Sequence, residues 1–116
     1  QAGVAKGVAV GGGGLMAVIR IYVPIVPYRS NMVEETADFL TSHFGGATVY
    51  HDCRGVWQDS DGLKVVDTIS VVESATRERL TYEQRLAITD FCLYLRRELK
   101  QDAIAYTISE GELYLV

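Results

Sequence analysis

Residues 17–23 carry the first clear pattern of the chain: four apolar residues alternate with a second set that includes Arg20 and Tyr22. A period of two is typical of a strand with one buried face, and Pro24 and Pro27 end the run. We therefore expect the first strand here, with Arg20 and Tyr22 on the face away from the core.

A helix is predicted to follow this strand. Asn31 and Glu34 have the spacing of a capping box, and apolar residues then recur at helical intervals as far as Gly45 and Gly46. Two glycines at this place are typical of a helix C-cap that leads into the next strand. The helix should therefore begin after Asn31 and end at Gly45.

Two strands joined by a tight turn are predicted next. Residues 47–53 are rich in β-forming side chains, a break is expected at 54–55, and residues 56–58 resume the strand. The polar run at 59–62 reads Asp-Ser-Asp-Gly, which is typical of a turn, and residues 63–73 return as a long strand.

The second helix is predicted from its cap and its apolar stripe. Thr81 and Gln84 have capping-box spacing, and the helix is expected to run from about Tyr82 to Lys100. Apolar residues at helical spacing mark the side that should face the core. The stripe comprises Ile88, Phe91, Cys92, Leu95 and Leu99.

The C-terminal residues favour a hairpin, because residues 103–108 and 112–116 are β-rich and flank Ser-Glu-Gly at 109–111. The order of elements is then β, α, β, β, α, β with one extra C-terminal hairpin strand. This order indicates an α+β domain of the ferredoxin-like, or split βαβ, class. Two helices should cover one face of an antiparallel sheet and leave its second face open.

The first fifteen residues differ from the rest of the chain. Gln1–Leu15 holds six of the eleven glycines and has no amphipathic period, and Met16 directly precedes the first strand. We interpret residues 1–15 as a flexible leader or an expression remnant, and residues 16–116 as a single domain.

Composition narrows the function classes. The chain has 116 residues, 48% of them hydrophobic, and a net charge of -4, which fits one compact domain and argues against broad binding to phosphate backbones. No apolar run approaches the about 18 residues of a membrane span. Cys53, Cys92, His43 and His51 lack the spacing of a metal site. We expect a cytoplasmic protein with reduced thiols and no metal, cofactor, membrane or nucleic-acid partner.

Four short motifs carry a resemblance to a known group. Residues 45–48 read Gly-Gly-Ala-Thr, 55–57 read Gly-Val-Trp, 61–62 read Asp-Gly and 100–102 read Lys-Gln-Asp. In this pattern the chain resembles a family of short bacterial proteins that share a domain of unknown function. The resemblance extends over most of residues 17–108, and it implies a common fold and no particular activity.

The segment from Tyr50 to Arg54 has the highest density of reactive side chains. Alternation puts His51 and Cys53 on one face of the strand and Tyr50, Asp52 and Arg54 on the other. His and Cys can act as base and nucleophile, but residues two apart on a strand are separated by about 6.5 to 7 Å. We favour packed core roles for His51 and Cys53, and we retain His51, Tyr50, Asp52 and Cys53 as candidate catalytic residues.

Trp57 is the single tryptophan of the chain and could be a ligand platform or a partner anchor. A structural role at the end of a strand is the interpretation we favour for it. Asp59 and Asp61 precede Gly62 at the spacing of a calcium loop, but the glutamate that completes such a loop is missing. A hairpin turn accounts for them.

We favour a non-catalytic binding or assembly module as the function. Val18, Tyr22 and Tyr50 would form the open face around Arg20 and Asp52, and Trp57 is a further candidate for a binding or interface residue. Through this face we expect a homo-oligomer, most simply a dimer, and the same face suits a small-molecule or protein partner.

The alternative is a small enzyme of the dimeric α+β-barrel type. Its active site would be an enclosed cavity between helices and sheet, where His51 acts with Tyr50 or Asp52 in proton transfer.

Overall fold

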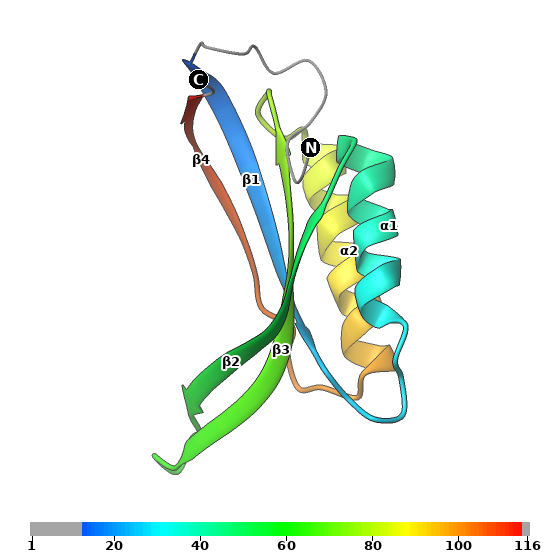
Figure 1. Ribbon diagram of the computed structural model, residues 1–116, viewed down its shortest axis with the longest axis vertical. Coiled ribbons are helices and arrows are strands. Elements are labelled where there is room, and N and C mark those ends of the chain that lie inside the picture. The colour runs from blue at the N-terminus through cyan, green and yellow to red at the C-terminus, as the bar shows by residue number, and fades with distance from the viewer. Residues whose placement is uncertain (1–12, 115–116) are drawn as a thin grey trace.

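The computed structural model describes residues 13–114 and forms a four-stranded antiparallel sheet with two helices on one face (Figure 1). The strand order is β2-β3-β1-β4, so β3 and β1 are central, and this is the ferredoxin-like arrangement predicted from the sequence. In chain order the elements are β1 (Gly13–Pro24), α1 (Met32–Phe44), β2 (Thr48–Gln58), β3 (Lys64–Thr76), α2 (Tyr82–Glu98) and β4 (Tyr106–Tyr114).

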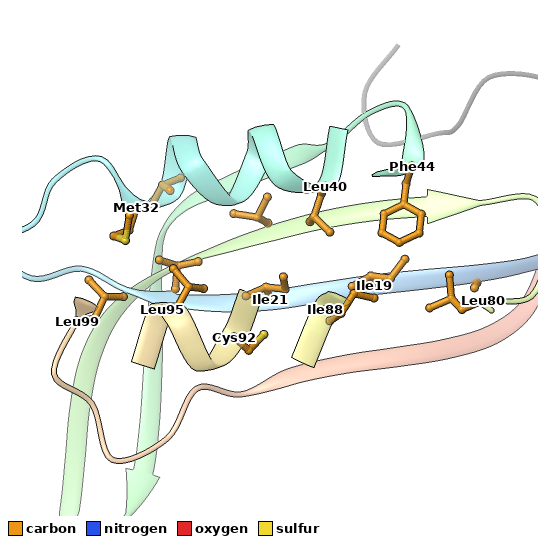
Figure 2. Close-up of a cluster of buried hydrophobic side chains, with 14 residues drawn as sticks. Ile19, Ile21, Met32, Leu40, Phe44, Leu80, Ile88, Cys92, Leu95 and Leu99 are labelled. Carbon is orange, nitrogen blue, oxygen red and sulfur yellow. The ribbon is translucent and has the colours of Figure 1, made fainter. Parts of the chain in front are cut away.

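The core lies between the helices and one face of β1. Ala17, Ile19, Ile21 and Val23 have no exposed surface, as the period-two pattern predicts. Both helices supply the opposing side chains, which interdigitate with those of the strand (Figure 2). The helix residues in this cluster include Met32, Leu40, Phe44, Ile88, Cys92, Leu95 and Leu99.

The two helices begin in different ways. At α2, Thr81 Oγ1 accepts a hydrogen bond from the Gln84 N–H at 3.1 Å, and Gln84 Oε1 accepts one from the Thr81 N–H at 2.8 Å, which confirms the predicted capping box. At α1, Asn31 makes no capping bond; its side-chain amide instead donates to Glu35 Oε2 at 2.8 Å. The capping box predicted at this helix is therefore wrong.

Polar contacts of the β1–α1 loop hold the C-terminal end of α2. Tyr28 donates a hydrogen bond to the Leu99 carbonyl oxygen at 2.6 Å. Arg29 bridges the helices, with nitrogens 3.3 Å from Glu35 Oε2 and 3.0 Å from Glu98 Oε1. These contacts fix the point at which the chain leaves α2 and crosses toward the sheet.

The β2–β3 hairpin extends past the ends of the helices, and we call residues 55–67 the hairpin arm (Figure 1). Val56 and Val66 pair across its two strands and are about half exposed, and Leu63 near its tip is 65% exposed. The arm thus consists of two strands with both faces accessible.

The C-terminal hairpin predicted at 109–111 is wrong. β4 runs without a turn, because Ser109, Glu110 and Gly111 pair in sequence with β1. The physical reason is that β1 begins at Gly13, so it is long enough to give these residues partners. Residues 13–15 of the predicted leader therefore belong to the strand, whereas residues 1–12 lie outside the described residues.

Leu95 tests the packing of α2 on the sheet. It is fully buried, so Leu95→Ala should lower the free energy of unfolding by about 2 to 5 kcal/mol. Chemical denaturation of both proteins measures this loss. A decrease below about 0.5 kcal/mol would show that this face of α2 does not pack in the core.

Candidate functional site

The face of the sheet that the helices leave uncovered, here called the open face, carries the candidate site. Arg20 and Tyr22 alternate with buried residues of β1 and therefore point to it. Val71 of β3 pairs with Tyr22 on one side and with Tyr50 of β2 on the other. Arg20, Tyr22 and Tyr50 therefore share this face, as alternation predicts.

A β-bulge interrupts β2 at the segment that is richest in reactive side chains. Tyr50 pairs with Val71 and Cys53 pairs with Ile69, so β2 holds one more residue than β3 across this interval. Asp52 has a left-handed φ of 55°, a conformation that aspartate tolerates better than most residues. The extra residue reverses the alternation of side chains beyond it.

The bulge changes which candidate residues lie together. It brings Cys53 and Trp57 to the face of Tyr50, whereas simple alternation groups Cys53 with His51. His51 and Asp52 are exposed and Cys53 is half-buried, so the prediction that His51 and Cys53 are core residues is wrong. An exposed His51 also does not line an enclosed cavity beneath the helices.

Glu73 joins Arg20 and Tyr50 in a polar cluster on the open face. Arg20 Nε lies 2.7 Å from Glu73 Oε1, and the Tyr50 hydroxyl donates to Glu73 Oε2 at 3.3 Å. Arg20 and Glu73 are direct cross-strand neighbours, and the Glu73 side chain is 18% exposed. The sequence predicts that Arg20 lies near Asp52. The structure shows instead that its partner is Glu73.

The Tyr50 hydroxyl is held in its neutral form. The negative charge of Glu73 raises the pKa of Tyr50, burial and the hydrogen bond to Glu73 raise it further, and Arg20 opposes the shift. A phenol with a raised pKa is a hydrogen-bond donor near neutral pH and a poor base. Tyr50 can therefore orient a partner carboxylate but not remove a proton.

A hollow of about 500 Å³ lies on the open face, further along β3 toward the hairpin arm, and Arg20, Tyr50 and Glu73 are not among its lining residues. It lies between the hairpin arm, the end of β1 and the segment that links α2 to β4. This volume falls within the range of small-molecule sites. The lining residues are Tyr22, Pro24, Trp57, Gln58, Asp59, Val65, Asp67, Ile69, Gln101, Asp102, Ala103 and Ala105.

The wall of the hollow is acidic. Asp59, Asp67 and Asp102 line it, and no Lys, Arg or His is among the lining residues. Asp59 also shapes the turn of the arm, since its Oδ1 accepts backbone N–H bonds from Asp61 at 2.9 Å and Leu63 at 2.8 Å. This confirms the hairpin turn predicted for the Asp-Ser-Asp-Gly run. Three carboxylates without a basic neighbour favour a cationic ligand.

Three residues of the site are not predicted from the sequence: Glu73, Asp67 and Asp102. Asp67 and Glu73 occur at even spacing along β3, and that period puts both on one face of the strand. The signal was present, but only the register with β1 shows which face is open. Asp102 follows a helix in an irregular segment and carries no pattern that would indicate a site.

Two further observations concern the part of the chain that the structure describes. Within residues 13–114, no three His, Cys, Asp or Glu side chains gather as a metal site would require. In the same range no helix has the length and apolar character of a membrane span.

The two cysteines should differ in reactivity. Cys92 is buried in the core, and burial raises the pKa of its thiol to about 12, whereas Cys53 is half-buried on the sheet. A thiol reagent should modify one cysteine of the folded protein and the second only after denaturation. Cys53→Ser should abolish the rapid reaction. Equal rates for both thiols would contradict the packing of Cys92.

Comparisons with known proteins show similarity to solved structures, among them two of phage SAM lyase. No family model and no curated protein matches the chain, so the resemblance to a bacterial family stays a prediction. A phage SAM lyase in its apo state is 20% identical, with a TM-score of 0.58, over 91% of this chain and 93% of that chain. A phage SAM lyase in complex with S-methyl-5'-thioadenosine is 18% identical, with a TM-score of 0.53, over 95% and 96%. At this identity the likeness shows a common α+β fold.

Proposed function

We propose that the chain is a small lyase that binds S-adenosylmethionine in the hollow of the open face and releases S-methyl-5'-thioadenosine. The observation that carries this proposal is the acidic, aromatic-walled hollow of about 500 Å³. The fold in which it occurs is similar to that of phage SAM lyase, including a structure with S-methyl-5'-thioadenosine bound. The small-enzyme alternative is thereby favoured over a non-catalytic module.

The lining of the hollow matches the two parts of this substrate. A sulfonium carries a positive charge at every pH, and the carboxylates of Asp67 and Asp102 provide the complementary field. The adenine ring needs a planar surface, and Trp57 and Tyr22 offer aromatic faces for stacking. Aromatic faces also attract cations, so both kinds of contact act together.

The polar cluster of the open face, which lies outside the lining of the hollow, contains the group that we propose for the chemical step. In a lyase reaction the carbon–sulfur bond breaks, and its electron pair stays on sulfur, which becomes a neutral thioether. If the carbon chain forms an alkene, a proton must leave the neighbouring carbon, and the carboxylate that we propose as its acceptor is Glu73, which Arg20 and Tyr50 orient. If the substrate carboxylate closes a ring on that carbon, no proton is transferred.

The proposed roles differ from those expected from the sequence. Glu73 takes the place of His51 and Asp52, which are exposed at the bulge. Tyr50 keeps a role as a hydrogen-bond donor to Glu73, and Arg20 holds the second carboxylate oxygen. Two fixed contacts on one carboxylate favour a single orientation toward the substrate.

The activity is tested by incubating the protein with S-adenosylmethionine and measuring S-methyl-5'-thioadenosine by chromatography. We expect one thioether formed for each substrate molecule lost. Glu73→Gln should lower kcat by about 100-fold if the carboxylate accepts a proton, and leave it nearly unchanged if the substrate closes a ring. If the parent protein neither binds nor converts the sulfonium, the lyase proposal is wrong and the non-catalytic module is favoured again.

The charge of the hollow gives a separate prediction. Asp67→Asn should raise KM for the sulfonium substrate by about 10-fold, because one carboxylate next to the cation is lost. Binding of the neutral S-methyl-5'-thioadenosine should change little. Asp61→Asn is the matched control, since Asp61 lies in the same hairpin and is absent from the lining. Equal effects on the charged and neutral ligands would contradict an electrostatic role for Asp67.

We further propose that the chain associates with itself through the open face, most simply as a dimer. Tyr50 and Trp57 are each 45% exposed there and Val65 is 37% exposed, so apolar and aromatic side chains of both β2 and β3 are accessible to a partner. A second copy seated on this face would also shield the hollow from solvent.

Tyr22→Asp tests this association. A carboxylate placed at the contact would be desolvated without a partner, so the oligomer should dissociate. Light scattering on the parent and the variant measures the mass in solution, and circular dichroism checks that the variant is folded. A parent protein that is monomeric throughout the micromolar range would contradict the proposal.

A further inference from the structure

Gly55 is an unusual residue in the hairpin arm. Along β2 it is the buried position, while the other residues from Thr48 to Gln58 are exposed or half-buried. Glycine inside a strand is unfavourable, because it loses much backbone freedom on folding and provides no side chain to pack. A specific reason is therefore needed for a glycine here.

Backbone conformation does not supply that reason. Among the described glycines, Gly45 and Gly62 have a positive φ, and Gly55 does not. Residues with a side chain can adopt the backbone conformation of Gly55 without strain. The requirement must come from the space above the Gly55 α carbon.

The indole ring of Trp57 occupies that space. A Cβ atom built on Gly55 would lie 3.0 Å from Trp57 Nε1, 3.1 Å from Cζ2 and 3.2 Å from Cε2. Carbon atoms in favourable contact are about 3.5 to 4.0 Å apart, so a methyl group at this position would push the ring outward. Trp57 follows Gly55 by two residues on the same face of the strand, and its ring folds back over the glycine.

This placement sets the ring against the acidic part of the hollow. Gly55 pairs with Asp67 across the hairpin, and Trp57 pairs with Val65. Trp57, Val65 and Asp67 all line the hollow. A ring that lies over Gly55 is therefore close to Asp67, the residue that pairs with Gly55.

We propose that Gly55 is a positioning residue, which holds the Trp57 indole in the orientation that stacks on the adenine ring of the ligand. The identity of the ligand rests on the proposed function. The effect of Gly55 on the Trp57 ring is independent of the proposed function, and it can be measured without ligand.

Two substitutions at Gly55, which introduce a small and then a larger side chain, test the proposal. Gly55→Ala requires the ring to move by a few tenths of an ångström, and Gly55→Val, which suits a strand, requires a larger movement. Because Trp57 is the only tryptophan, emission excited at a wavelength that tyrosine does not absorb, and its quenching by acrylamide, report on this ring alone. We expect a shifted emission maximum and stronger quenching in both variants, with larger changes in Gly55→Val than in Gly55→Ala. The melting temperature should be retained or raised.

Binding of S-methyl-5'-thioadenosine, measured by calorimetry, is the second readout. Trp57→Ala should weaken binding by about 10-fold, the low end of what stacking of one base contributes. Gly55→Val should approach the same loss, and Gly55→Ala should weaken binding less. In the Trp57→Ala background Gly55→Ala should have no further effect, because its action passes through the ring. Val56→Ala, on the opposite face of the arm, is the control and should change neither readout.

The outcomes separate this inference from the proposed function. Unchanged emission and quenching in both Gly55 variants would overturn the positioning role, even if the ligand binds. A moved ring with unchanged affinity would show that the ring does not serve the ligand, and would also overturn it. If the parent protein does not bind the thioether, the lyase proposal fails with the ligand part of the inference, and the emission data still decide whether Gly55 positions the ring.

Discussion

The helices are shorter than the strands that they cover, and the hairpin arm extends beyond the helices because of that difference. An α-helix rises about 1.5 Å per residue and a strand about 3.3 Å, so the 13 residues of α1 span about 20 Å and the 13 residues of β3 about 43 Å. The helices therefore cover only part of the sheet, and the hairpin arm continues beyond them. A two-stranded ribbon is marginally stable by itself, but β3 also pairs with β1 in the body of the sheet and anchors the arm. The hollow forms where this arm, the end of β1 and the segment after α2 meet.

A single extra residue determines which side chains face that hollow. Beyond the bulge at Asp52, the odd-numbered residues of β2 point to the open face. Without it, Gly55 and Trp57 would point to the other face and Val56 would take their place on the open face. The aromatic wall of the hollow and its close contact with Gly55 both depend on this irregularity. Bulges commonly occur beside functional sites for this reason, because they re-aim a side chain without altering the rest of the sheet.

Patterns that act within one element could be predicted from the sequence, and relations between elements could not. The alternation around Ile21 identified a central strand and its two faces, because burial of one face is a strong constraint on a period-two sequence. The bulge was missed because Asp52 carries no marker as specific as glycine. Arg20 was assigned to the wrong carboxylate because its cross-strand neighbour, Glu73, is determined by register and lies 53 positions away. The turn expected around Gly111 is wrong for the same kind of reason. β1 is longer than expected and pairs with Gly111, so this residue lies within a strand.

The open face has two electrostatic zones, and the proposed reaction would use the difference between them. Around Glu73, one negative charge is balanced by Arg20, whereas the hollow holds three aspartates and no basic residue. In the proposed reaction, the hollow would attract a sulfonium substrate through its charge and through its adenine ring. Cleavage of the carbon–sulfur bond would remove the charge but not the ring, so the product would keep the stacking contact and lose the electrostatic one. Because such electrostatic contacts would end with the chemical step, the proposed site would hold the substrate more tightly than the product, and this would limit inhibition by a thioether that stacks on Trp57.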